Sequence, residues 1–233
     1  MAIHYFIWND TDSRNKHIRV QKRIPIIRPE ERVQHVTIPG RSGELTQTEG
    51  DQIYNSYIQS VEIGVEGLEN VRAAENWLKG EGRVSFDNQP EMEQKARIIG
   101  AVTLEKHSRN VDRWKATVQF YCDPIKRAVN EQAITVTTSG ASVNNPGDMT
   151  AYPKIEITGS GLITVRAGGK TLTIPACESG WIIDSENEWI LQGTTPLEGV
   201  CSGDFPVLEK GANTVTFTGS VTKLLITPNF RYL

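Results

Sequence analysis

The stretch Arg113-Trp114-Lys115-Ala116-Thr117-Val118-Gln119-Phe120-Tyr121 decides the fold class. Every second position is apolar, at Trp114, Ala116, Val118 and Phe120, and polar residues lie between them. Successive side chains of a β-strand point to opposite faces of a sheet, so this period of two is typical of a half-buried strand. The pattern predicts a sheet with a core on one side.

Strands also dominate the rest of the chain. In the first half, β-branched residues flanked by polar ones predict strands at residues 17–27, 32–38, 53–63 and 95–104. The second half predicts three hairpins: residues 162–166 with 171–174 around Gly168-Gly169, residues 181–184 with 188–191, and residues 213–218 with 221–227 around Gly219-Ser220. Many short antiparallel strands are typical of a sandwich or a barrel.

One segment departs from the strand pattern. Between residues 68 and 79, four apolar side chains recur at helical spacing, at Leu68, Val71, Ala74 and Leu78. Gly80 follows as a stop signal. We expect a short amphipathic helix that packs on the first sheet.

Charge and composition argue against several classes of function. The 233-residue chain has a formal net charge of −3, which argues against binding nucleic acid through bulk positive charge. No apolar run approaches the roughly 18 residues of a membrane span, and we expect residues 1–8 to form a strand rather than a signal peptide. The net charge changes from +1 over residues 1–130 to −4 over residues 131–233, which predicts two domains with these bounds.

No set of residues converges on an active site, so we expect no enzyme, no cofactor and no metal ion. Gly169-Lys170-Thr171 lacks the earlier glycine of a phosphate-binding loop, and Ser42 lacks the flanking pattern of a catalytic serine. The four histidines show no metal-ligand spacing. The three cysteines are widely spaced, which favours buried free thiols, with a Cys177–Cys201 bridge as the alternative.

The hairpin at residues 181–191 leaves two alternatives open. Asp184, Glu186 and Glu188 alternate, as calcium ligands or glycosidase carboxylates can, but the same stretch has the composition of a solvated hairpin tip. Trp181 and Trp189 flank this tip. They are candidate glycan contacts through their flat apolar faces, and a position in the core is the alternative.

The order of several motifs resembles that of the distal tail protein (Dit) family of phages with long, non-contractile tails. In the first half these motifs are residues 38–45, the helix followed by residues 82–87, and residues 120–124. In the second half they are residues 145–148, 152–157, 159–161, 168–169, 182–185, 203–208, 211–215 and 228–233. Glycine, proline and asparagine mark turns in any β protein, so the resemblance rests on the order and spacing over almost the whole chain.

The resemblance implies a mainly β fold, in which an N-terminal β-sandwich with one short α-helix precedes a C-terminal galectin-like β-sandwich. It implies a non-enzymatic subunit of the tail tip, or baseplate hub, of a siphovirus or a prophage. Six copies form a homohexameric ring that joins the major tail tube protein to the tail-associated lysin or hub protein and anchors the adhesion apparatus. Such a protein is made in the cytoplasm of the bacterial host and located at the virion tail tip.

Within such a ring, one loop is the candidate interface: Gly40, Arg41, Ser42, Gly43, Glu44 and Leu45. It is glycine-rich and flanked by strands, and Arg41 can pair with an acidic residue of a neighbouring subunit. An ordinary exposed turn is the alternative. We expect no room for the inserted carbohydrate-binding module that some relatives carry. The alternative function is a carbohydrate-binding protein that recognises host cell-surface glycan through the C-terminal sandwich.

Overall fold

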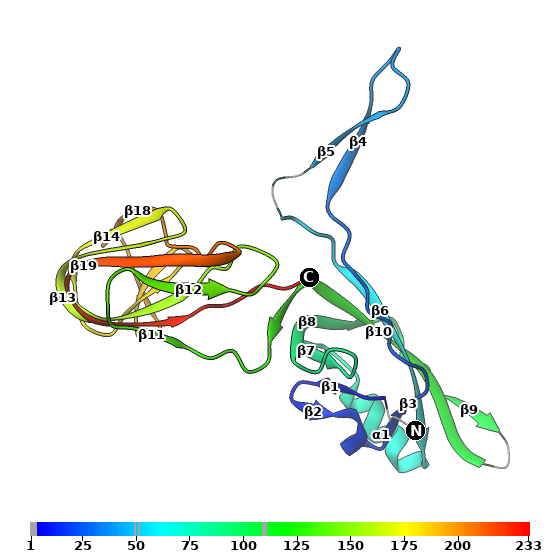
Figure 1. The fold of residues 1–233 in the computed structure, drawn as a ribbon. Coiled ribbons are helices and arrows are strands. Elements are labelled where there is room, and N and C mark those ends of the chain that lie inside the picture. The colour runs from blue at the N-terminus through cyan, green and yellow to red at the C-terminus, as the bar shows by residue number, and fades with distance from the viewer. Residues whose placement is uncertain (1–3, 49, 51, 109–110) are drawn as a thin grey trace. The chain divides into compact units, whose positions relative to one another are not determined.

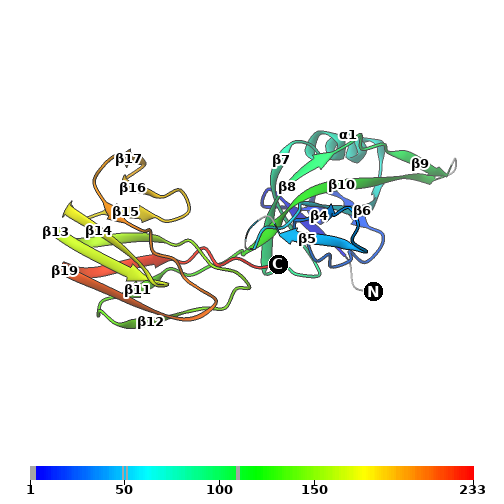
Figure 2. The same cartoon turned by 90° about the horizontal axis from the view of Figure 1, so that it is seen from above.

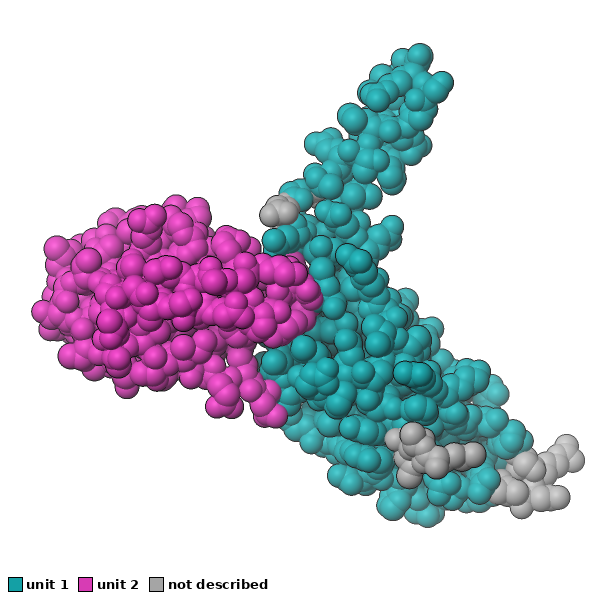
Figure 3. All heavy atoms as spheres, in the orientation of Figure 1, with its two compact units in different colours: residues 1–129, 233 teal, residues 130–232 magenta. Residues whose placement is uncertain are grey.

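The computed structural model describes residues 4–48, 50, 52–108 and 111–233. The chain divides into two compact units, which Figure 3 distinguishes by colour. Unit 1 comprises residues 1–129 together with Leu233, and unit 2 comprises residues 130–232. Each unit has its own cluster of buried apolar side chains. Two cores therefore stabilise the chain, and we describe each unit by itself.

Unit 1 is built on an antiparallel sheet with the strand order β2-β1-β7-β8-β10-β6-β3, and β9 pairs with β10 (Figure 1). The strands are β1 (Phe6–Trp8), β2 (Thr11–Asp12), β3 (Ile18–Val20), β6 (Tyr57–Glu66), β7 (Glu81–Phe86), β8 (Met92–Ile99), β9 (Glu105–Ser108) and β10 (Val111–Ala128). A short 3-10 helix, Ser13–Lys16, joins β2 to β3. The strand expected at residues 17–27 is therefore much shorter than predicted.

The alternating stretch forms a half-buried strand of this sheet, β10, as the sequence predicts. In β10, Ala116, Val118 and Phe120 are buried, whereas the side chains between them are exposed. β10 pairs with β6 on one side and with β8 on the other. The register with β8 shifts between Cys122 and Lys126, where Pro124 cannot donate a ladder hydrogen bond.

The sheet folds over onto itself and encloses an aromatic core. The rings of Phe6 and Trp8 in β1 lie 5.3 and 5.5 Å from the ring of Phe120 in β10, although β7 and β8 separate these strands in sheet order. The helix α1 (Leu68–Trp77) closes the core, and Trp77 stacks on Phe6 at 5.6 Å. This arrangement confirms the expected sandwich with one helix.

One residue of the expected apolar helix face is placed differently. Val71, Ala74 and Leu78 are buried as predicted, whereas Leu68 is 48% exposed. Leu68 is the first residue of α1, immediately after Gly67 with φ +89°, so it precedes the part of the helix that contacts the sheet. The spacing of apolar residues shows which face of a helix is buried, but it does not show how far along the helix the covering sheet extends.

Unit 2 is a sandwich of two antiparallel layers (Figure 2). Its strands are β11 (Ile134–Val136), β12 (Ala141–Asn145), β13 (Lys154–Ala167), β14 (Lys170–Cys177), β15 (Trp181–Asp184), β16 (Trp189–Gln192), β17 (Thr195–Leu197), β18 (Ser202–Gly203) and β19 (Gly211–Thr227). One layer contains the strands β11, β19, β13, β15, β16 and β17, paired in this order. In the other layer β12 pairs with the opposite end of β19, β14 pairs with the opposite end of β13, and β18 pairs with β14. The two long strands therefore bend together and belong to both layers.

Two of the three predicted hairpins are confirmed. β13 and β14 meet at the Ala167–Lys170 pair around Gly168 and Gly169, with φ +56° and +75°. β15 and β16 meet at the Asp184–Trp189 pair. Consecutive residues with positive φ match the right-handed twist of the flanking strands, which explains why the glycine pair gives a tight hairpin.

The third predicted hairpin is wrong, because β19 runs without interruption through Gly219 and Ser220. The register between β13 and β19 shifts on either side of this point, so both strands bend there. A Cβ atom on Gly219 would lie only 2.1 Å from the carbonyl oxygen of Leu162. Glycine is present because the two backbones approach closely at the bend, and not because the chain reverses.

A buried carboxylate in unit 2 makes its stability depend on pH. Asp184 is 2% exposed, and its Oδ2 accepts hydrogen bonds from Lys154 Nζ and Asn187 Nδ2, each at 3.0 Å. Burial raises the pKa of Asp184, but the hydrogen bonds from Asn187 and Lys154 outweigh this effect, so its pKa lies below the usual 3.8. Such a group stabilises the fold above its unfolded pKa, and the stabilisation is lost as the pH falls through the folded pKa.

We therefore expect the free energy of unfolding to fall more steeply below about pH 4 in the native chain than in Asp184→Asn. Urea titrations between about pH 2 and pH 7 measure this slope for both chains. Asn keeps the size of the side chain and removes its charge. Equal slopes for the two chains would show that Asp184 does not contribute.

Candidate assembly surfaces

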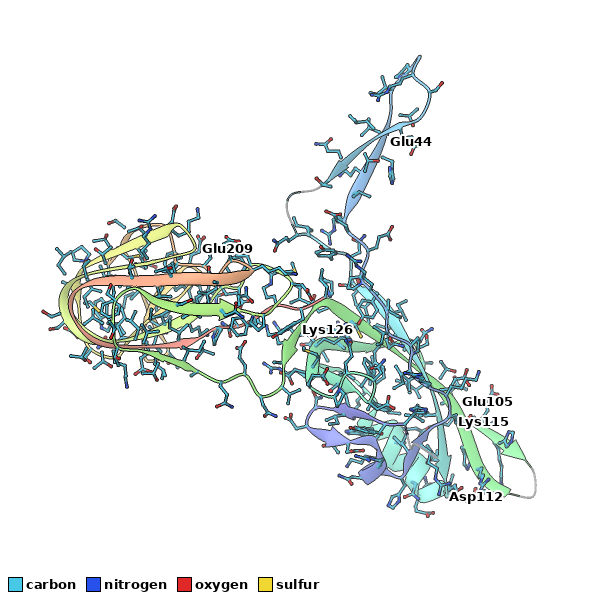
Figure 4. The ribbon with its side chains drawn as sticks, viewed as in Figure 1. Glu44, Glu105, Asp112, Lys115, Lys126 and Glu209 are labelled. Atoms are coloured by element: carbon cyan, nitrogen blue, oxygen red, sulfur yellow. The ribbon has the colours of Figure 1, made fainter. Side chains whose placement is uncertain are left out.

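The loop that the sequence singles out lies at the end of a projecting hairpin, which we call the arm (residues 33–48). β4 (Val33–Thr37) pairs only with β5 (Glu44–Thr48) to form a separate two-stranded sheet. In Figure 1 the arm extends away from the main sheet of unit 1, and Figure 4 labels Glu44 on it. All six residues of the candidate interface are exposed: Gly40, Arg41, Ser42, Gly43, Glu44 and Leu45.

Glycine is required at two positions of the arm tip. Gly40 and Gly43 have φ of +80° and +82°, in the region that other residues rarely adopt. The backbone N–H of Arg41 donates to the carbonyl oxygen of Ile38 at 3.2 Å, which closes the turn. A Cβ atom at either glycine would have no neighbour within 4 Å, so their role is the backbone conformation and not close packing.

The arm has one apolar and one polar face. Cross-strand partners share a face of a hairpin, so the pair Val36–Leu45 lies on one face, together with Ile38. These three side chains are 40, 44 and 37% exposed. On the other face Nδ1 of His35 lies 3.2 Å from Oγ1 of Thr46. A lone two-stranded hairpin is marginally stable in water, and no described residue of the chain covers this apolar face, so the arm is a candidate assembly surface.

A second exposed surface lies on the outer face of the main sheet of unit 1. Four cross-strand partners form a continuous row, which we call the outer row: Glu81 in β7, Arg97 in β8, Tyr121 in β10 and Ile58 in β6. Tyr121 and Ile58 are each 47% exposed. Most of this row borders a shallow hollow of about 580 Å³ that Lys95 and Asp123 also line. Because four strands contribute one residue each, no sequence motif marks this surface.

The two tryptophans do not form an exposed pair. Trp181 is 8% exposed and belongs to the core of unit 2, whereas Trp189 is 51% exposed. Asp184, the first of the three alternating acids, is held by Lys154 and Asn187. Among the residues that the structure describes, no group of three His, Cys, Asp or Glu side chains is placed to hold a metal ion.

The cysteines are free thiols. Cys122 and Cys177 are buried, and Cys201 is half-buried. Burial raises the pKa of Cys122 to about 12, so it is protonated at neutral pH and is a poor nucleophile. Within the described part of the chain, no helix is long and apolar enough to cross a membrane.

Comparison with known proteins identifies the fold. No family model matches the chain, and no curated protein matches its sequence. A solved structure does match: SPP1 Dit (gp 19.1), described as a paradigm of the hub adsorption apparatus in phages that infect Gram-positive bacteria. The TM-score is 0.76 over 100% of both chains, at 19% sequence identity. This chain is thus a two-unit, mainly β protein with the fold of SPP1 Dit from end to end, which confirms the Dit resemblance at the level of the fold.

Proposed function

We propose that this chain is a structural subunit of a phage tail tip and a member of the Dit family. The observation that carries the proposal is the likeness in fold to SPP1 Dit over the full length of both chains. Fold alone does not define function, so a second observation matters. The exposed apolar face of the arm indicates a chain that assembles with others.

The assembly we infer is a closed ring of six copies. The arm and the outer row are different surfaces, and a contact between unlike surfaces of identical chains closes into a ring when the rotation permits it. The ring would join the major tail tube protein to the tail-associated lysin or hub protein and anchor the adhesion apparatus at the virion tail tip. Its role is mechanical, and it needs no cofactor.

Immunogold labelling of tailed particles that contain this chain tests the proposed location. We expect gold at the distal end of the tail, between the tube and the adhesion apparatus. Antibody depleted on the purified chain serves as the control and should leave the particles unlabelled. Label along the whole tube, on the capsid, or on no particle would contradict a tail-tip role.

The apolar face of the arm is expected to drive assembly. Leu45→Asp places a charge where we expect an apolar contact, and should raise the dissociation constant of the assembled species at least tenfold, since roughly 1.4 kcal/mol corresponds to this factor. Thr46→Asp is the matched control, because Thr46 lies on the polar face beside His35. Analytical ultracentrifugation measures both variants. Equal dissociation constants would show that the apolar face makes no contact.

The exposure of Trp189 favours glycan binding as a second candidate function. A glycan array with the full chain and with Trp189→Ala tests it. Binding that disappears in the variant would support this candidate. The absence of binding to bacterial surface glycans would leave the structural role alone.

A further inference from the structure

A glycine in the middle of β6 is not required by the fold of unit 1. Gly64 pairs with Arg19 in β3 on one side and with Lys115 in β10 on the other. Its φ lies outside the left-handed region, so other residues can adopt this backbone conformation. A Cβ atom there would meet only the flexible side chain of Gln21, with Nε2 at 2.6 Å. Because glycine within a strand often marks the close approach of a ligand, the surface above Gly64 is a candidate site.

The surface above this glycine is a hollow lined mainly by positive charge, which we call the Gly64 hollow. It has a volume of about 370 Å³ and is lined by residues of β3, β6, β9 and β10. Arg19, Arg113 and Lys115 are exposed cations in its lining, and Glu66 is the only carboxylate among the described residues there. Glu105, the cross-strand partner of Lys115 (Figure 4), borders a neighbouring hollow instead. The lining therefore complements an anion.

Several hydrogen-bond donors of the Gly64 hollow are available to a ligand. Among the residues that the structure describes, Lys115 forms no ion pair and the side-chain amide of Gln21 has no hydrogen-bond partner. Nε of Arg113 donates to Oε1 of Glu66 at 2.7 Å, and Nη1 of Arg19 lies 3.7 Å from the same oxygen. The one carboxylate is thus already held, and terminal nitrogens of both guanidinium groups remain to bind an anion.

The arrangement of these donors favours a phosphate group as the ligand. Arg19 and Lys115 lie on opposite sides of Gly64, two strands or roughly 10 Å apart at their Cα atoms. A tetrahedral phosphate has oxygens in several directions, so it can accept from both sides at once, whereas the two oxygens of a carboxylate lie in one plane. Arginine binds phosphate through its fork of N–H donors, and lysine binds it as a point charge.

The surroundings of the hollow favour a polymer of phosphates without bases. Residues 13–23, which include β3, contain five Lys or Arg and no Asp or Glu, so positive charge continues beyond the hollow. Trp114 is the one aromatic residue of the described lining, and it packs against the core of unit 1. The hollow therefore offers no exposed ring on which a nucleic-acid base can stack.

We propose that the Gly64 hollow binds a phosphate group of a polyol-phosphate or sugar-phosphate polymer. Arg19 and Lys115 bind the phosphate from its two sides, Gln21 Nε2 donates to it from the floor, and Gly64 leaves the room that it occupies. This binding site is separate from the arm and does not depend on the formation of a ring. It assigns to unit 1 a ligand that the proposed structural role does not require.

Fluorescence anisotropy of labelled poly(glycerol phosphate) with the full chain tests the proposal. We expect saturable binding at physiological ionic strength, where scattered surface charges are largely screened. Lys115→Gln should weaken it about tenfold, because a charge-assisted contact is lost. Lys79→Gln is the matched control, since it removes the same charge from an exposed position of unit 1 outside the hollow. Absence of saturable binding, or equal losses in the two variants, would overturn the proposal.

Gly64→Ala tests the role of the glycine. The added Cβ fills the floor of the hollow and displaces the Gln21 amide, so binding should weaken about tenfold. The backbone conformation suits alanine, so urea titration should show no loss of stability. Native affinity in this variant would overturn the proposed position of the phosphate. Unlabelled single-stranded DNA at the same phosphate concentration should not displace the polymer, and displacement would overturn the assignment to a polymer without bases.

Discussion

Gly219→Ala is expected to lower the free energy of unfolding of unit 2 by about 3–5 kcal/mol. Gly219 has φ +93°, and an added Cβ would lie 2.1 Å from the carbonyl oxygen of Leu162 and 3.3 Å from Cα of Ile163. The nearest of these atoms is backbone in a paired strand, so neither a rotamer change nor a flexible side chain can relieve the clash. The bend that lets β13 and β19 belong to both layers would have to open.

Gly161→Ala is the matched control for this prediction. Gly161 belongs to the same bend and has φ +81°, but a Cβ there meets no atom within 4 Å. It should cost only about 1–2 kcal/mol, which is the penalty of a left-handed backbone conformation. Chemical denaturation measures the free energy of unfolding of both variants. Hydrogen exchange then assigns the loss of stability to unit 2. Equal losses would show that the close approach at Gly219 is not what requires glycine.

Phe120→Ala is expected to destabilise unit 1 by about 3–5 kcal/mol. Phe120 is fully buried, and its ring lies within 5.8 Å of the rings of Phe6, Trp8 and Phe86. These rings come from two other strands of the folded sheet, β1 and β7, so the cavity cannot close without moving paired strands. The effect should appear in the same denaturation experiment as an earlier unfolding of unit 1.

The neighbouring Tyr121→Ala serves as the control, because Tyr121 points to the exposed face of the same strand. The stability of the unassembled chain should change by less than about 1 kcal/mol. If Tyr121→Ala lowered the free energy of unfolding as much as Phe120→Ala does, the assignment of the buried and exposed faces of β10 would be wrong. A small loss for Phe120→Ala would show that the aromatic cluster is not the main contact between the two halves of the sheet.

The features that the sequence predicts correctly are those that depend on residues close together in the chain. The alternation of β10 depends only on which face each side chain occupies, and the Gly168-Gly169 hairpin depends only on local backbone conformation. Gly219-Ser220 has the same local signal as a turn, but its glycine is required by Leu162, more than fifty residues earlier in the chain. The sequence therefore shows a glycine of the kind found in turns, but the contact with Leu162 that requires this glycine is visible only in the structure.

Of the two candidate assembly surfaces, the sequence reveals one and not the other. The tip residues from Gly40 to Leu45 are recognisable because glycine and an exposed arginine occur together between strands. The outer row is not recognisable, because Glu81, Arg97, Tyr121 and Ile58 become neighbours only through strand pairing. Trp181 and Trp189 lie at opposite ends of one hairpin and have opposite exposure, which depends on the layer that covers β15. Such features follow from tertiary structure.

The measurement that tests the ring most directly is light scattering of the purified chain over a range of concentrations, followed by negative-stain imaging of the largest species. Six copies of the 25.9 kDa chain predict a species of about 155 kDa that images as a closed ring. Dilution should dissociate it, and Leu45→Asp should shift that dissociation to higher concentration. A chain that scatters as a 25.9 kDa monomer at every concentration, with no ring in the images, would contradict the account.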